Sequence, residues 1–125
     1  MSAHVFHICT RAAVAAAQEL GAYRPVSLDH EGFVHLSHAH QVLPTARAYF
    51  AGVPDLVVLV IDGSRLTAPL VFEPPAPLAS STPKPASDDL YPHCYGPIDL
   101  AAIVDVIALD DWQVRGEFLR GEQRP

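Results

Sequence analysis

Ionisable side chains stand alone among apolar neighbours at three places in the chain, and chemistry is expected there. His7 lies in "HVFHIC", His35 lies in "FVHLS", and Glu73 ends "LVFE". Because side chains alternate across a strand, each of these residues shares its face with apolar neighbours. Imidazole and carboxylate groups that meet in one cleft are suited to binding a polar ligand and to catalysis. We therefore predict that His7, His35 and Glu73 converge on one cleft.

A metal site is a second interpretation of the histidine-rich stretch. His35, His38 and His40 lie close together in the sequence, and zinc accepts imidazole ligands. A strand-to-helix junction directs the three side chains differently, and neither an H-E-x-x-H pair nor a Cys/His ribbon spacing is present. We interpret His38 and His40 as solvated residues of a helical turn, and we expect that folding needs no metal. A metalloprotein that combines His35 with His7 or His93 stays open as an alternative.

The string "YPHCYGPI" places Tyr91, His93 and Tyr95 at alternate positions. Pro92 and Pro97 restrict the backbone around them. Two phenols and an imidazole on one face suit a flat, polar ligand that stacks on aromatic rings. The alternative is a rigid loop packed on the core, because burial of the rings alone would explain the tyrosines.

Composition and missing motifs narrow the classes of function. Cys9 and Cys94 are far apart and show no C-x-x-C spacing, which predicts reduced structural thiols in a cytoplasmic protein. The net charge is -6, with 8 Lys+Arg against 14 Asp+Glu and no basic run, which argues against a nucleic-acid partner. The N-terminal residues lack a signal-peptide pattern, and no run approaches the ~20 apolar residues of a membrane span. Nucleotide-binding glycine motifs, Walker loops and G-x-S-x-G elbows are also absent from the sequence.

The elements that must position these side chains form a β-α-β-α order followed mostly by strands. We expect two main helices, at 11–20 and 38–50, and strands at 4–9, 33–37, 55–62, 70–73 and 102–110. Thr10 and Ser37 are placed to cap the two helices, and Pro44 requires either a kink or a short turn ahead of the second helix. The run 55–62 is apolar on both faces, so it should be a central strand covered on both sides. This order predicts an α+β fold.

The expected organisation is a single domain over residues 1–125, with a core over 4–109 and a polar C-terminal tail over 110–125. The segment 23–32 is expected to be a turn-rich connection. The proline-rich segment 74–89 is expected to be a mobile flap over the cleft, because prolines remove backbone donors. Trp112 is the residue expected to dock the tail. We expect a monomer or a weak homodimer.

Several strings together resemble the bacterial and plant family catalogued as domain of unknown function 952. They are "VFHICT", "LDHEGFVHLSHAHQV", "VVLVID", "LVFE" and "YPHCYGPI", in the right order, and the resemblance covers His4 to Leu109. That family is grouped with the ADP-ribosyltransferase-like fold, a split mixed sheet whose central cleft holds NAD in the active members. The resemblance therefore implies a split mixed β-sheet with two main helices and an NAD-like nucleotide as the small-molecule partner.

The resemblance also implies roles for single residues. His7 or His35 would take the position of the nucleotide-binding residue, Ser37 or Tyr95 the hydroxyl position, and Glu73 the position of the glutamate. The Ser-Thr-Ser string and the E-x-E turn of the transferase toxins are absent here, and basic side chains for a phosphate are scarce. Membership of the fold therefore does not by itself imply that the chemistry is retained.

The leading interpretation is a cytoplasmic protein that binds an NAD-like nucleotide and breaks or transfers at its nicotinamide–ribose bond. No cofactor is required, and NAD is the candidate substrate. A non-catalytic ligand-binding or interaction domain on the same fold is the alternative. In the leading interpretation the catalytic residues are Glu73 and His35, and the ligand-binding residues are His7, Ser37, His93 and Tyr95.

Overall fold

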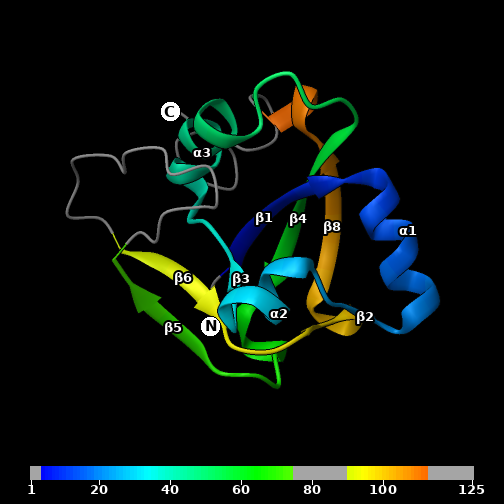
Figure 1. The fold of residues 1–125 in the computed structure, drawn as a ribbon, viewed down its shortest axis with the longest axis vertical. Helices are drawn as coiled ribbons and strands as arrows, with labels where there is room; N and C mark the ends of the chain where they lie inside the picture. Colours follow the sequence, from blue (N-terminus) through cyan, green and yellow to red (C-terminus); the bar gives the residue numbers. More distant parts are fainter. Residues whose placement is uncertain (1–3, 75–89, 113–125) are drawn as a thin grey trace, which may run out of the picture.

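The computed structural model of the chain describes residues 4–74 and 90–112, in which small antiparallel sheets are combined with α-helices (Figure 1). The helices are α1 (Arg11–Leu20), α2 (Val26–Glu31) and α3 (Val42–Tyr49), with a 3₁₀ turn at Ala39–Gln41 ahead of α3. The strands are β1 (His4–Thr10), β2 (Ala22–Tyr23), β3 (Val34–His35), β4 (Leu56–Asp62), β5 (Leu70–Glu73), β6 (Tyr91–Cys94), β7 (Ile98–Asp99) and β8 (Ile103–Ala108).

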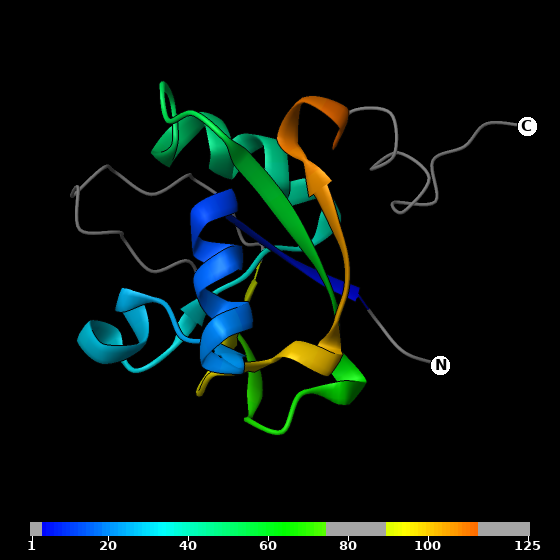
Figure 2. The same cartoon turned by 90° about the vertical axis from the view of Figure 1, so that its right-hand side faces the viewer.

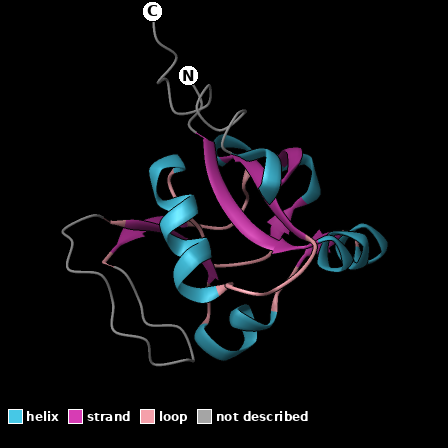
Figure 3. Cartoon of the chain, turned by 90° about the horizontal axis from the view of Figure 1, so that it is seen from above, coloured by secondary structure: helices cyan, strands magenta, loops and turns pink. Residues whose placement is uncertain are grey.

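The central sheet has the order β1-β4-β8, and every residue of β4 is buried. Helices lie on both sides of this sheet (Figure 3). Val5 and Cys9 of β1 belong to the core cluster that includes α1, whereas Phe6 and Ile8 belong to the cluster that includes α3. The alternation predicted for β1 and the central position predicted for β4 are therefore confirmed.

The ends of the helices follow from local signals in most cases. Thr10 caps α1 by accepting a hydrogen bond from the backbone N–H of Ala13 at 3.1 Å. The helix ends at Gly21, whose φ of 95° suits a residue without a Cβ. In Figure 2, α1 lies in front of β1 and β4. Pro44 lies in the first turn of α3, after a separate 3₁₀ turn, so the second of the two predicted alternatives is confirmed.

Ser37 does not cap a helix, which corrects the sequence-based prediction. His38 is the residue that caps the 3₁₀ turn, and its backbone N–H donates to Oε1 of Gln41 at 2.8 Å. The backbone of Ser37 instead pairs with Phe6 of β1, through hydrogen bonds of 2.7 and 2.9 Å. A local capping signal cannot anticipate this pairing, because its partner is distant in the sequence.

The second sheet has the order β3-β6-β5, and Ser37, which follows β3, forms an isolated backbone bridge with Phe6 of β1. Beyond that pairing the two sheets separate, with β5 and β6 on one side of Figure 1 and β4 and β8 on the other. A third, two-stranded sheet pairs β2 with β7. The α+β class is therefore confirmed, but the strand pairings within the described residues are antiparallel rather than those of a mixed sheet.

The connection 23–32 differs from the sequence-based expectation, and two other segments lie outside the described residues. The connection 23–32 contains α2, which begins after Pro25 and ends at Gly32. Residues 75–89, where we expected the flap, and the tail 113–125 lie outside the described residues. Trp112 is fully buried, with its ring 5.2 Å from that of Phe6. No helix in the described residues is both long and apolar enough to span a membrane.

Candidate functional site

A cleft of about 390 Å³ opens where the two sheets separate. Residues of β1, β3 and β6 line it, and residues from α2 and α3 close it. Its aromatic walls are Tyr23, Tyr49, Phe50 and Tyr91, and its histidines are His7, His35 and His93. No lysine or arginine of the described ranges lines the cleft. The surface offered to a ligand is thus largely apolar and aromatic, with imidazole as its main ionisable group.

Both ring nitrogens of His7 are engaged by protein groups. Nδ1 lies 2.6 Å from the backbone carbonyl oxygen of His35, and Nε2 lies 2.7 Å from the hydroxyl of Tyr23. A carbonyl only accepts, so Nδ1 donates, and Nε2 of the neutral ring accepts the hydroxyl proton of Tyr23. Burial lowers the pKa of His7 to about 4, so the ring is neutral at neutral pH. His7 therefore joins β1, β2 and β3 as an uncharged group.

His35 is held by Glu31, a residue that the sequence analysis did not single out. Nε2 of His35 lies 2.6 Å from Oε1 of Glu31, which ends α2. An ionised carboxylate only accepts, so a neutral His35 donates from Nε2 and keeps Nδ1 as an acceptor. The only signal in the sequence is the four-residue spacing between the two residues, and it becomes a contact because Gly32 reverses the chain at a φ of 85°.

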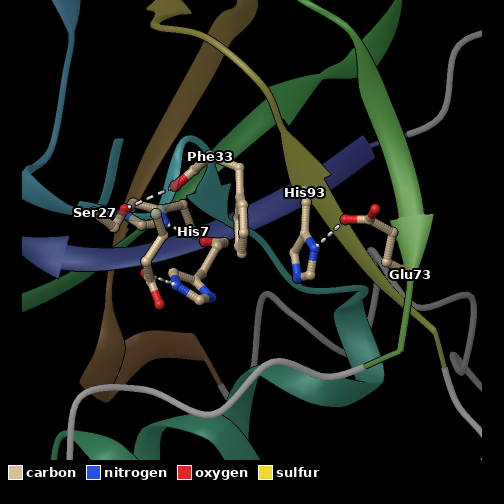
Figure 4. Close-up of polar contacts among 7 residues, drawn as sticks. His7, Ser27, Phe33, Glu73 and His93 are labelled. Atoms are coloured by element: carbon tan, nitrogen blue, oxygen red, sulfur yellow. Dashed lines mark hydrogen bonds and ion pairs between the residues drawn. The ribbon is translucent and has the colours of Figure 1, made fainter. Parts of the chain in front are cut away.

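Glu73 holds His93 in the same way from the opposite side. Oε1 of Glu73 accepts from Nδ1 of His93 at 2.6 Å (Figure 4), and it also accepts from the hydroxyl of Tyr95 at 2.7 Å. The hydrogen bond from the Tyr95 hydroxyl, followed by that from His93, holds the pKa of Glu73 below its usual value. The bond between Tyr95 and Glu73 also raises the pKa of Tyr95. Glu73 is therefore ionised, and a neutral His93 presents Nε2 as its acceptor.

The rings of His35 and His93 are neighbours across the pair β3–β6. The two residues are direct partners in the antiparallel register, and their ring centroids are 5.7 Å apart. Phe33 stacks on His93 at 4.2 Å and meets His35 edge-on at 4.8 Å. In Figure 4 the ring of Phe33 stands on one side of His93 and Glu73 on the other. Hydrogen bonds and aromatic packing thus fix both imidazoles.

The predicted site residues separate into two groups. His7, His35, Ser37 and His93 line the cleft. Glu73 and Tyr95 do not line it, and they reach the site only through the bond between Glu73 and His93. Of the three residues predicted to converge on one cleft, His7 and His35 line it and Glu73 does not, which corrects the prediction for Glu73. The position of Glu73 behind an imidazole is a finding that the strand pattern did not indicate.

The metalloprotein alternative gains no support from this geometry. In the part of the chain that the structure describes, no group of three or more His, Cys, Asp or Glu side chains is arranged to hold a metal ion. His38 and His40 stack on each other outside the cleft, with centroids 6.0 Å apart. Both cysteines are buried, and burial raises the pKa of Cys9 to about 11 and also raises that of Cys94. A protonated, buried thiol is a poor nucleophile.

Solved structures show the same fold. The crystal structure of protein CC0527 from Caulobacter crescentus superimposes with a TM-score of 0.69 at 24% identity over 84% of each chain. The solution structure of CC0527 gives a TM-score of 0.58 at 23% identity, covering 85% of this chain and 84% of that one. No curated protein matches this chain. At this level of identity the likeness concerns the fold alone.

The sequence also matches a protein family over most of its length. Residues 8–106 match the family described as "Protein of unknown function (DUF952)". This range includes the three strands that carry His35, Glu73 and His93, and the chain belongs to the DUF952 family.

Proposed function

We propose that this protein binds an NAD-like nucleotide and that the nicotinamide–ribose end of the ligand enters the cleft. The observation that carries the proposal is the cleft itself, about 390 Å³ of apolar and aromatic wall on which oriented histidines converge. Pockets for small ligands typically measure about 300–1,000 Å³ and combine apolar walls with a few polar groups. The lower end of that range suits one half of a dinucleotide. The family is grouped with ADP-ribosyltransferase-like folds, and this analogy also supports an NAD-like ligand.

Charge indicates which half of the ligand enters. No lysine or arginine lines the cleft within the described residues, and His7 is neutral. Phosphate groups would find no fixed positive charge there. The oxidised nicotinamide ring carries a positive charge and a flat face, and aromatic walls such as those of Tyr49 and Tyr91 attract such a ring. The phosphates would then extend out of the cleft toward solvent.

A catalytic form of the proposal uses the Glu73–His93 pair on water. A water molecule held by Nε2 of His93 would attack the ribose C1′, forming a C–O bond as the C–N bond to nicotinamide breaks. The leaving nicotinamide takes the bonding electron pair and becomes neutral, and His93 accepts the proton of the water. Glu73 would hold the ring in the required tautomer and stabilise the imidazolium that forms, as a positioning residue.

A non-catalytic ligand-binding domain is the second candidate, and one observation favours it. The transition state for breaking this bond resembles an oxocarbenium ion, which a nearby carboxylate stabilises. Neither Glu31 nor Glu73 lines the cleft, and each is instead hydrogen-bonded to a histidine that lines it. In this form of the proposal the ligand is bound and released unchanged.

Calorimetric titration with NAD, nicotinamide riboside and ADP-ribose tests the binding proposal. We expect NAD and nicotinamide riboside to bind more tightly than ADP-ribose, which lacks the ring. We also expect His93→Gln to weaken binding, whereas His40→Gln, a change at an exposed residue outside the cleft, should not. Equal affinity for ADP-ribose and NAD would show that the ring is not the part recognised. Release of nicotinamide, followed by chromatography, separates the catalytic form from the binding form.

A further inference from the structure

The two glutamates fix which nitrogen of each cleft histidine carries the hydrogen. Glu31 takes the Nε2 hydrogen of His35, and Glu73 takes the Nδ1 hydrogen of His93, both at 2.6 Å. In the neutral form of each ring one nitrogen then keeps a free lone pair, Nδ1 in His35 and Nε2 in His93. Within the described residues no hydrogen bond is found to either of these nitrogens. They are acceptors without a donor.

Strand geometry directs the two rings to the same side. Leu36 donates its backbone N–H to Pro92, so the neighbouring pair His35–His93 is one whose backbone groups turn away from each other. In such pairs the Cα atoms are about 4.5 Å apart and the side chains approach closely. Both rings line the cleft, and Phe33 contacts both. The cleft wall thus presents a pair of fixed acceptors.

Among the described residues that line the cleft, no lysine or arginine adds a fixed positive charge or a fixed donor beside the two acceptors. Hydroxyl groups such as those of Thr45 and Tyr49 rotate, so they donate or accept as a ligand requires. His7 adds no donor, because its Nδ1 hydrogen is used by the carbonyl of His35. The carboxylates of Glu31 and Glu73 stand directly behind the two rings and make the local potential negative.

We propose that the His35–His93 pair selects ligand edges that carry hydrogen-bond donors and rejects carboxylates and other anions. For a pyridine ring this means selection of the carboxamide over the carboxylate, which deepens the function proposed above and rests on it. A carboxamide NH₂ supplies two hydrogens to two waiting acceptors. A carboxylate supplies none and places its negative charge against two lone pairs. A site built to pair a donor discriminates strongly against an analogue that lacks it.

Titration with nicotinamide riboside and nicotinic acid riboside at pH 8.5 is the direct test. The two ligands differ only in the carboxamide and the carboxylate, and an ordinary imidazole is neutral at that pH. We expect the amide to bind at least about tenfold more tightly. Equal or tighter binding of the acid would overturn the proposed selection while leaving nucleotide binding in place. If neither ligand binds and NAD does not bind either, the proposed function and the selection both fail.

A spectroscopic measurement tests the premise without any ligand. Two-dimensional ¹H–¹⁵N correlation of the imidazole rings distinguishes the two tautomers. We expect an unprotonated Nδ1 in His35 and an unprotonated Nε2 in His93. The opposite tautomer in either ring would overturn the proposal, because that ring would then present a donor to the cleft.

Charge-neutral variants complete the experiment. In Glu31→Gln and Glu73→Gln the new amide either donates to or accepts from its histidine, so neither tautomer is fixed. We expect the amide-over-acid preference in each variant to fall to within about threefold, since a ring free to change tautomer can donate to the acid. Glu19→Gln, the same change on the exposed face of α1, should keep the parent preference. A preference that survives intact in both glutamate variants would assign the selection to other groups.

Discussion

The His7 imidazole makes the stability of this fold depend on pH in a defined direction. Burial lowers the pKa of His7 from 6.5 to about 4. Between those two values the unfolded chain binds a proton that the folded chain does not, so the free energy of unfolding decreases as the pH falls. The contribution of the neutral ring is fully present above pH 6.5 and is lost by about pH 4.

The size of the effect follows from the pKa difference. A difference of one pKa unit corresponds to about 1.4 kcal/mol, so the whole window is worth about 3 kcal/mol for a ring that stays enclosed. Between pH 7 and pH 5 the linkage relation gives a loss of about 2 kcal/mol. If the free energy of unfolding falls by about 1–2 kcal/mol per molar urea, the urea concentration at the unfolding midpoint should be lower at pH 5 by roughly 1–2 M from this residue alone.

The matched variant is His7→Asn, in which a side-chain amide donates toward the carbonyl of His35 but does not titrate. Urea unfolding should show that, between pH 7 and pH 5, the free energy of unfolding falls by about 2 kcal/mol more in the natural chain than in the variant. Comparing the two proteins cancels the contribution of the other titrating groups, which both share. The ring resonances of His7 should remain those of a neutral imidazole at pH 5. An equal pH dependence in the two proteins, or a His7 ring that titrates near its ordinary pKa, would refute this reasoning.

Three further substitutions test the packing that positions the cleft. Thr10→Ala should lower the free energy of unfolding by about 1 kcal/mol through loss of the α1 cap, as measured by urea unfolding. Trp112→Ala should cost about 3–5 kcal/mol because the ring is fully buried, whereas Leu20→Ala, at 67% exposure, should change the same measurement little. Gly96→Ala should lower the melting temperature, because the added Cβ would lie 2.6 Å from Cβ of Ala68. An unchanged melting temperature would show that the loop shifts freely.

The periodicity of apolar residues and the local helix-end signals predicted those parts of the fold that residues adjacent in the sequence determine. The alternation of β1 and the apolar run of β4 were sufficient, because burial on known faces leaves few alternatives for such strands. Thr10 and Gly21 marked both ends of α1. The convergence of the cleft histidines followed from the same alternation, since each ring projects from one face of its strand.

Contacts between distant segments could not be predicted from those patterns. Ser37 looked like a helix cap, but its backbone pairs with Phe6, and only the folded chain brings these residues together. Glu31 became a partner of His35 because a short helix and a left-handed glycine return the chain upon itself, although the segment reads as turns. Glu73 was predicted to enter the cleft, and its place behind His93 depends on the pairing of β5 with β6.

The opening of the cleft leaves a backbone group that needs a partner, and this explains why a histidine occupies position 7. Leu36 directs its N–H to β6, so the carbonyl of the preceding residue, His35, points away from that strand and toward β1. Continued pairing with β1 would close the gap, whereas an unpaired buried carbonyl would be costly. Nδ1 of His7 donates to that carbonyl across the gap, and Nε2 receives the hydroxyl of Tyr23. A side chain thus replaces the missing rung of the sheet, and the strands stay apart at a distance set by an imidazole ring.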